Sequence, residues 1–102
     1  MEDSMKRPED KFRDDLIKEI RHRFDGSIVL KNDPDYIQGI PDLLVIHGDK
    51  WAALECKRSS NASHRPNQDY YINKMNRMSY AAFIYPENKD DILDALQQAF
   101  GA

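Results

Sequence analysis

Three charged residues stand at the ends of two apolar segments, where a charge is costly unless it binds something. Asp42 opens the first segment, and Glu55 and Lys57 close the second. Residues 47–50 between them, with the sequence His-Gly-Asp-Lys, suit a hairpin turn that would pair the two segments as adjacent strands. Because side chains alternate along a strand, Glu55 and Lys57 share one face and Cys56 points to the other. Two carboxylates brought together in this way favour a hard divalent cation.

The elements that would position these residues follow from the hydrophobic periodicity of the chain. Helices are expected to begin at Pro8, Pro66 and Lys89, and strands are expected at 27–31, 42–47, 51–57 and 80–85. Residues 1–7 carry no such pattern and are expected to be flexible. The order helix, three strands, helix, strand, helix predicts a small α/β domain with a mixed sheet and helices on both faces.

Length and composition limit the class of protein. The 102 residues are enough for one domain, and the net charge of −3 argues mildly against a simple nucleic-acid coat protein. No apolar stretch is long enough to span a membrane, and the charged residues 1–11 do not read as a signal peptide. The single cysteine fits a reducing compartment, so a cytoplasmic location is expected.

The charge is unevenly spread along the chain. Residues 57–77 carry five basic residues against one acid, whereas residues 87–102 carry four acids against one basic residue. The basic segment therefore adjoins the candidate site. The histidines at positions 22, 47 and 64 lack the spacing of a zinc site and are expected at the surface.

The combination of these motifs resembles a known family. Gly39-Ile40-Pro41-Asp42, then Glu55-Cys56-Lys57 on the adjoining strand, then Gln68 at the next helix, resembles the PD-(D/E)xK nuclease superfamily. The resemblance is closest to small VRR-NUC-type and phage or archaeal Holliday-junction-resolvase-like endonucleases. It extends from about residue 6 to residue 100. It implies a restriction-endonuclease-like core in the order α-β-β-β-α-β-α, in the cytoplasm of a bacterium or a phage-infected host.

The resemblance also implies roles for individual residues. Asp42, Glu55 and the backbone carbonyl of Cys56 would hold Mg²⁺, with Mn²⁺ as a substitute. Such a set suits Mg²⁺, which keeps several waters and needs few protein ligands. Lys57 would orient or deprotonate the attacking water and stabilise charge in the transition state.

A further acid is expected from the first helix, because many superfamily members carry a helix glutamate that completes the metal site. Glu9 lies three residues before Phe12 and shares the inward stripe of this helix, while Glu19, beside Ile20, is the alternative. The resolvase-like pattern places the acid near the start of the helix, which favours Glu9. A glutamate in the first turn also complements the helix dipole, which is the structural alternative.

Gln68 has two interpretations. It lies on the apolar side of the helix that begins at Pro66, where its amide should be hydrogen-bonded. In the resemblance it points toward the site and touches water or phosphate. The alternative is a helix-start residue that satisfies backbone donors.

Five basic residues flank the site or continue away from it, and they are expected to contact DNA phosphates without reading sequence. These are Arg58, His64, Arg65, Lys74 and Arg77. The predicted function is a metal-dependent endonuclease that cleaves branched DNA, such as a four-way junction, as a homodimer. The alternatives are a VRR-NUC-type flap or nicking endonuclease, a non-catalytic DNA-binding module that retains the fold, and a small interaction protein.

Overall fold

The computed structural model describes residues 6–102, which form three helices and one four-stranded sheet. In chain order the elements are α1 (Pro8–Arg23), β1 (Ile28–Lys31), β2 (Leu43–His47), β3 (Lys50–Cys56), α2 (Pro66–Met78), β4 (Tyr80–Ile84) and α3 (Lys89–Phe100). The predicted α/β class and element order are confirmed, and each expected element lies within about two residues of its observed bounds. Residues 1–5 of the segment expected to be flexible lie outside the described range. Lys6 pairs with Asp14 at 2.8 Å.

The sheet is mixed and has the strand order β1-β2-β3-β4. β1, β2 and β3 are antiparallel neighbours, and β4 runs parallel to β3 after the crossover through α2. In the β2–β3 hairpin His47 pairs with Lys50, which leaves a two-residue turn. Gly48 opens that turn with φ +64°, a conformation that two-residue hairpins require and that glycine adopts at no steric cost.

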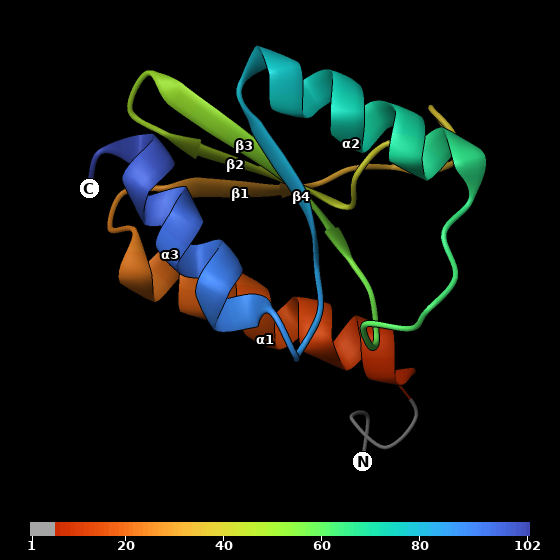
Figure 1. The fold of residues 1–102 in the computed structure, drawn as a ribbon. Coiled ribbons are helices and arrows are strands. Elements are labelled where there is room, and N and C mark those ends of the chain that lie inside the picture. Colours follow the sequence, from red (N-terminus) through yellow and green to blue (C-terminus); the bar gives the residue numbers. More distant parts are fainter. Residues whose placement is uncertain (1–5) are drawn as a thin grey trace.

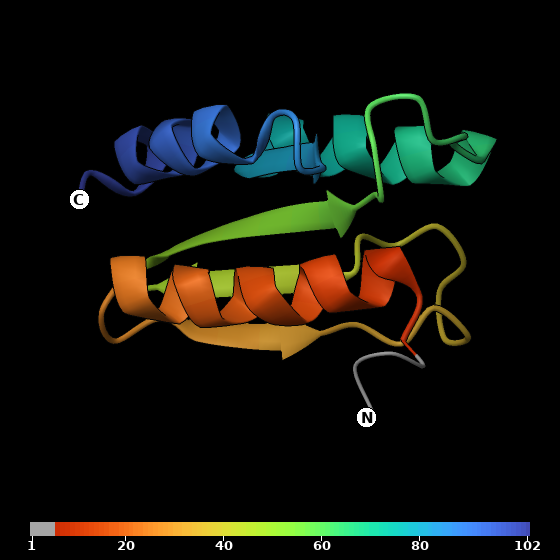
Figure 2. The ribbon, with the colours of Figure 1, turned by 90° about the horizontal axis from the view of Figure 1, so that it is seen from below.

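Helices cover both faces of the sheet unequally (Figure 1). α1 and α3 lie together on one face and α2 lies on the other, as the second view also shows (Figure 2). The larger core fills the α1/α3 side, where Leu16, Ile20 and Phe24 of α1 pack against the strands and α3. On the α2 side only a small cluster is buried. It consists of Ile72 of α2 and the small side chains Ala53 of β3 and Ala81 of β4.

His47 departs from the expected surface position. Its ring stacks on Phe100 with centroids 5.4 Å apart and meets the edge of Phe24 at 6.1 Å. Its Nδ1 atom is buried and has no hydrogen-bond partner within residues 6–102. The expectation for His47 was wrong because a histidine at a strand end can pack as an aromatic ring when two phenylalanines are nearby.

The helices give no sign of a membrane segment. Across the described part of the chain, none combines the length and the apolar character needed to cross a bilayer.

Candidate active site

The predicted site residues gather at one end of the sheet. Asp42 stands just before β2 and Lys57 just after β3, so both lie where the hairpin strands meet this end. α1 and α2 both begin at the same end, on opposite sides of the sheet (Figures 1 and 2). Because helix N-termini carry partial positive charge, two of them here favour an anionic ligand.

Asp42 and β3 hold each other through reciprocal hydrogen bonds. The backbone N–H of Asp42 donates to Oε1 of Glu55 at 3.1 Å. The backbone N–H of Cys56 donates to Oδ2 of Asp42 at 2.9 Å. Asn32 fixes the preceding loop, since its N–H donates to the carbonyl of Asp42 at 2.8 Å. Each carboxylate therefore has one oxygen anchored on the backbone, which fixes the direction of the pair.

Pro41 leaves a backbone oxygen open beside the two acids. Continuing the β2–β3 register by two residues brings Pro41 opposite Cys56. In a strand the N–H and C=O of one residue point to the same edge, so the carbonyl of Cys56 faces Asp42 as its N–H does. A proline has no N–H and cannot donate to that carbonyl across the ladder. The Pro-Asp sequence thus supplies one carboxylate and spares one carbonyl.

Lys57 and Gln68 complete the network from the α2 side. Nζ of Lys57 donates to Oε1 of Gln68 at 2.8 Å and lies 3.9 Å from Oε2 of Glu55. Nε2 of Gln68 donates to the same Glu55 oxygen at 3.1 Å, and its Oε1 also accepts from the backbone N–H of Arg65 at 3.0 Å. The amide of Gln68 therefore points toward the site, as the first interpretation expects, and it also satisfies a backbone donor at the start of α2, as the second does.

Gly39 explains how the site loop approaches α2. Its φ is +87°, and a Cβ atom placed on it would lie 2.7 Å from the backbone carbonyl carbon of Asn67. A side chain here would meet backbone, which cannot move aside cheaply. Glycine is therefore required to bring the loop before Asp42 against the first turn of α2, where Gln68 resides.

Burial makes the charges of the site costly. Glu55 and Lys57 are only 5% and 7% exposed. Glu55 lies opposite Phe83 of β4 and two residues after Ala53, so apolar side chains border it beside its polar partners. Desolvation, and secondly the repulsion of Asp42, raises the pKa of Glu55 to about 8, although Lys57 opposes the shift. Desolvation also raises the pKa of Asp42, against the lowering effect of the Cys56 N–H.

A divalent cation fits this donor set. Two carboxylates with raised pKa values and a backbone carbonyl are hard oxygen donors, and a bound cation would offset the desolvation that raises those values. Within residues 6–102, no three His, Cys, Asp or Glu side chains are grouped so as to hold one ion. The candidate set is therefore two acids and one carbonyl, which leaves most coordination positions to water. Burial raises the pKa of the Cys56 thiol, which packs in the core on the opposite face.

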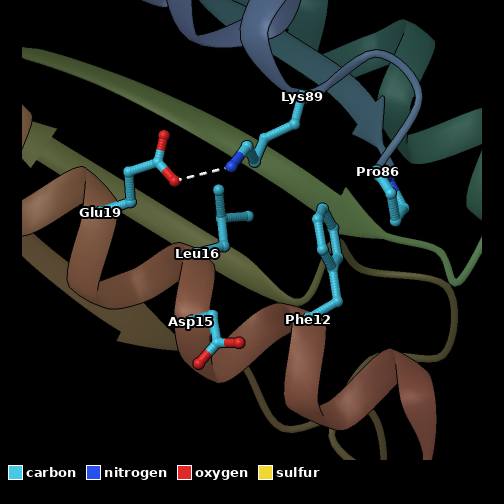
Figure 3. Close-up of a pocket in the computed structure, with 6 residues that line it drawn as sticks. All are labelled: Phe12, Asp15, Leu16, Glu19, Pro86 and Lys89. Carbon is cyan, nitrogen blue, oxygen red and sulfur yellow. Dashed lines mark hydrogen bonds and ion pairs between the residues drawn. The ribbon is translucent and has the colours of Figure 1, made fainter.

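The two candidate acids of α1 lie in different surroundings. Desolvation and the nearby charge of Asp42 raise the pKa of Glu9, while Lys57 opposes this shift. Glu19 instead accepts a hydrogen bond from Nζ of Lys89 at 2.8 Å. Figure 3 shows this pair in a small pocket between α1 and the start of α3, with Phe12, Leu16 and Pro86. Of the two acids, Glu9 is the one that interacts with the site.

Arg13 is a site residue that sequence reasoning missed. It follows Glu9 by one helical turn, and its charge lowers the pKa values of Asp42, Glu9 and Cys56. Its Nε atom is buried without a hydrogen-bond partner among residues 6–102, and Nη2 lies 3.4 Å from Oδ1 of Asp10. The sequence did contain a signal for Arg13. It lies four residues after Glu9 and three and four residues before the buried Leu16 and Ile17, so it shares their side of the helix.

The basic residues expected to contact phosphates lie at different distances along the chain from the site. Arg58 and Arg65 are exposed and bracket the loop between β3 and α2. The ring of His64 stacks on Phe83 with centroids 3.8 Å apart, and its Nδ1 lies 3.1 Å from Oδ1 of Asp69. Lys74 and Arg77 are exposed in the second half of α2 and continue away from the site.

Comparisons with known proteins identify no relative of this chain. No family model, no curated protein and no solved structure matches it. The arguments about function therefore rest on its own residues.

Proposed function

We propose that this protein is a metal-dependent endonuclease of the PD-(D/E)xK superfamily that hydrolyses DNA phosphodiester bonds. The observation that carries the proposal is the buried network at the end of the sheet. There Asp42 and Glu55 anchor one another while Lys57 and Gln68 approach the same carboxylate. A structural ion pair would need one acid and one base. Two desolvated acids with raised pKa values are instead an arrangement that a bound divalent cation would stabilise in the ionised form.

Asp42, Glu55 and the Cys56 carbonyl would hold Mg²⁺ or Mn²⁺, and Glu9 of α1 would add negative charge near the site. When bound, the ion would polarise the phosphate and lower the pKa of a coordinated water. Lys57 is held by Gln68 at 2.8 Å, so its ammonium group is positioned to orient the attacking water and to stabilise charge on the phosphate. Water would attack phosphorus and lose a proton to solvent, the bond to the 3′ oxygen would break, and that oxygen would take up a proton from solvent.

The proposed substrate is branched DNA such as a four-way junction, and the proposed enzyme is a homodimer. A four-way junction is twofold symmetric, so a twofold dimer presents one site to each of two opposed strands. Arg58 and Arg65 beside the site, with Lys74 and Arg77 further along α2, supply positive charge for the backbone. Arginine and lysine contacts to phosphates position a duplex without reading its sequence, which suits recognition by shape.

The test is cleavage of labelled four-way junction, flap, duplex and single-stranded DNA with Mg²⁺, Mn²⁺ or EDTA. Junction cleavage is expected with either metal and not with EDTA. Asp42→Asn and Lys57→Met should each lower the rate by at least about 100-fold, because the first removes a metal ligand and the second removes the ammonium group that stabilises charge on the phosphate. Asp25→Asn, an exposed acid after α1, is the matched control and should keep the wild-type rate.

Other outcomes separate the alternatives. Cutting of flaps or nicking of duplex without junction cleavage would assign the VRR-NUC-type flap or nicking activity. Binding of DNA without any metal-dependent cutting would overturn the nuclease proposal and leave a non-catalytic module. Retained cutting by Asp42→Asn would overturn the assignment of the site.

A further inference from the structure

A basic hollow lies between α1 and β1, the strand at one edge of the sheet. It has a volume of about 470 Å³ and is lined by four basic residues, Lys6, Lys18, Arg21 and Lys31. Asp14 is the one acid that lines it, and the buried side chains of Ile17 and Val29 form its floor. The lining therefore carries more positive than negative charge, and it includes none of the basic residues proposed above to contact DNA. We call this hollow the α1/β1 groove.

Asp14 gathers two of the cations without neutralising the groove. Its Oδ2 accepts a hydrogen bond from Nζ of Lys6 at 2.8 Å, and its Oδ1 accepts one from Nζ of Lys31 at 3.5 Å. The hydrogen bond from Lys6 is the largest effect on the pKa of Asp14, which is lowered, so the carboxylate stays ionised and holds both ammonium groups near it. Lys18 and Arg21 are exposed further along α1, and their side chains make no ion pair or hydrogen bond with the rest of residues 6–102.

The groove begins beside the candidate active site. Lys31, the last residue of β1, pairs with Leu43, which directly follows Asp42. On the side of α1, Arg13 acts on Asp42 through its charge, and its Nε lies 4.0 Å from Oδ1 of Asp14. Positive charge therefore extends from the site into the groove along both elements that form it.

We propose that the α1/β1 groove binds the phosphate backbone of one arm of branched DNA, while the basic residues of α2 bind another arm. The inference rests on the proposed function, and it adds a second binding surface to it. A helix rises about 1.5 Å per residue, so Asp14 with its two lysines and Arg21 are about 10 Å apart along α1, with Lys18 between them. Phosphates of one strand recur about every 3.4 Å along a duplex, so the groove has the length of about three successive phosphates.

The two basic surfaces lie on opposite faces of the sheet. α1 covers one face and α2 covers the other (Figures 1 and 2). A straight duplex that follows one of these helices does not reach the outer side of the other. Two arms that diverge from the site would each follow one helix, which is the arrangement of strands at the branch point of a junction.

A phosphate backbone suits the groove better than an acidic protein does. Ile17 and Val29 are only 7% and 8% exposed, so the floor offers little apolar area to a partner. A protein interface has an apolar core inside its polar rim, whereas backbone phosphates require mainly exposed lysine and arginine side chains. An acidic protein that occupied the groove would leave DNA binding unaffected by substitutions in it.

The test is binding of four-way junction and of duplex DNA in EDTA over a range of salt concentrations, which separates binding from cleavage. Lys18→Gln and Arg21→Gln should each weaken junction binding at least about threefold, and each should lower the slope of log K against log salt by about one. Lys50→Gln is the matched control. Lys50 is exposed at the start of β3, the end away from the site, and it should leave the affinity and the slope unchanged.

Asp14→Asn tests the groove with the opposite sign. It removes the acid of the groove and leaves all four cations, so junction binding should become at least about threefold tighter. A groove with a structural role alone predicts no gain, because the variant loses the ion pairs of Asp14 with Lys6 and Lys31. A duplex can use either surface in turn, so Lys18→Gln combined with Arg21→Gln should weaken duplex binding less than it weakens junction binding.

Three outcomes would overturn the proposal. These are wild-type junction binding by both Lys18→Gln and Arg21→Gln, no gain in affinity from Asp14→Asn, and equal losses on duplex and junction in the combined variant. Metal-dependent junction cleavage together with any of these would remove the groove and leave the nuclease. Conversely, the expected changes in binding by a protein that cuts no DNA would leave the groove and remove the nuclease.

Discussion

Glu55→Gln should stabilise the metal-free protein at alkaline pH and flatten its dependence on pH. The ordinary pKa of this carboxyl is 4.5, and burial raises it to about 8 in the folded state. Between these values the folded protein binds a proton that the unfolded chain does not. Stability is therefore fully present at low pH and is lost as pH rises from about 4.5 to about 8. Glutamine has no proton to lose and removes this contribution.

The size of the effect follows from the shift. At about 1.4 kcal/mol per pKa unit, the carboxyl costs about 2 kcal/mol at pH 6 and about 4 kcal/mol at pH 8 relative to its neutral form. In the wild type, Oε2 of Glu55 accepts a hydrogen bond from Nε2 of Gln68 at 3.1 Å. In Glu55→Gln an NH₂ group takes the place of that oxygen, and the loss of this hydrogen bond costs about 1 kcal/mol. The net gain in the free energy of unfolding should be about 3 kcal/mol at pH 8 and close to zero near pH 5.

The assay is urea unfolding in EDTA at several pH values from 5 to 8.5, with the wild type, Glu55→Gln and Glu87→Gln. Glu87 is the control because its carboxylate is exposed and accepts hydrogen bonds from Ser60, which lower its pKa. Its removal should not flatten the loss of stability at alkaline pH. Parallel pH profiles for the wild type and Glu55→Gln would refute the reasoning, because they would mean that Glu55 ionises in the folded protein as it does in the unfolded chain.

Three further predictions follow from the same site. Mg²⁺ should raise the melting temperature of the wild type, and by more at pH 8 than at pH 6, because protons compete with the ion for the two acids. Asp42→Asn should abolish this shift in melting temperature, and an equal shift in the variant would contradict the ligand assignment. Gly39→Ala should lower the free energy of unfolding in urea by about 2–4 kcal/mol, because the added Cβ is strained by the positive φ and meets the backbone of Asn67. Gly26→Ala is the comparison for the positive φ alone, since a Cβ at Gly26 meets nothing within 4 Å. Arg13→Met should raise the pKa of Asp42, measurable by NMR titration of its carboxyl carbon, and an unchanged titration would remove Arg13 from the site.

The sequence predicted the hairpin and the placement of Asp42, Glu55 and Lys57 well, for physical reasons. Two apolar segments joined by a short glycine turn can pair as strands in few registers, and the register determines on which face of the sheet each side chain lies. Gln68 was placed on the correct side of α2, since helical spacing determines that side. Its simultaneous contacts with Lys57 and the helix start were not predictable, because they depend on where the two elements meet.

Other features depend on packing that no local pattern encodes. The close approach of Gly39 to Asn67 arises from the route of the loop, although the glycine itself was noted. Arg13 was missed because a basic residue in a charged helix is usually solvated, and only the docking of α1 on the sheet carries it toward Asp42. His47 was placed at the surface because its phenylalanine neighbours come from distant helices.

The site residues lie close together in the sequence, which affects the expected order of folding. Asp42, Glu55, Lys57 and Gln68 all belong to residues 39–68, so their contacts span short stretches of chain and can form early. We expect the carboxylates to lose water only later, when β4 brings Phe83 beside Glu55. We therefore predict that the electrostatic cost is incurred after the rate-limiting step. Alkaline pH should therefore act mainly by accelerating unfolding, while the folding rate stays nearly constant.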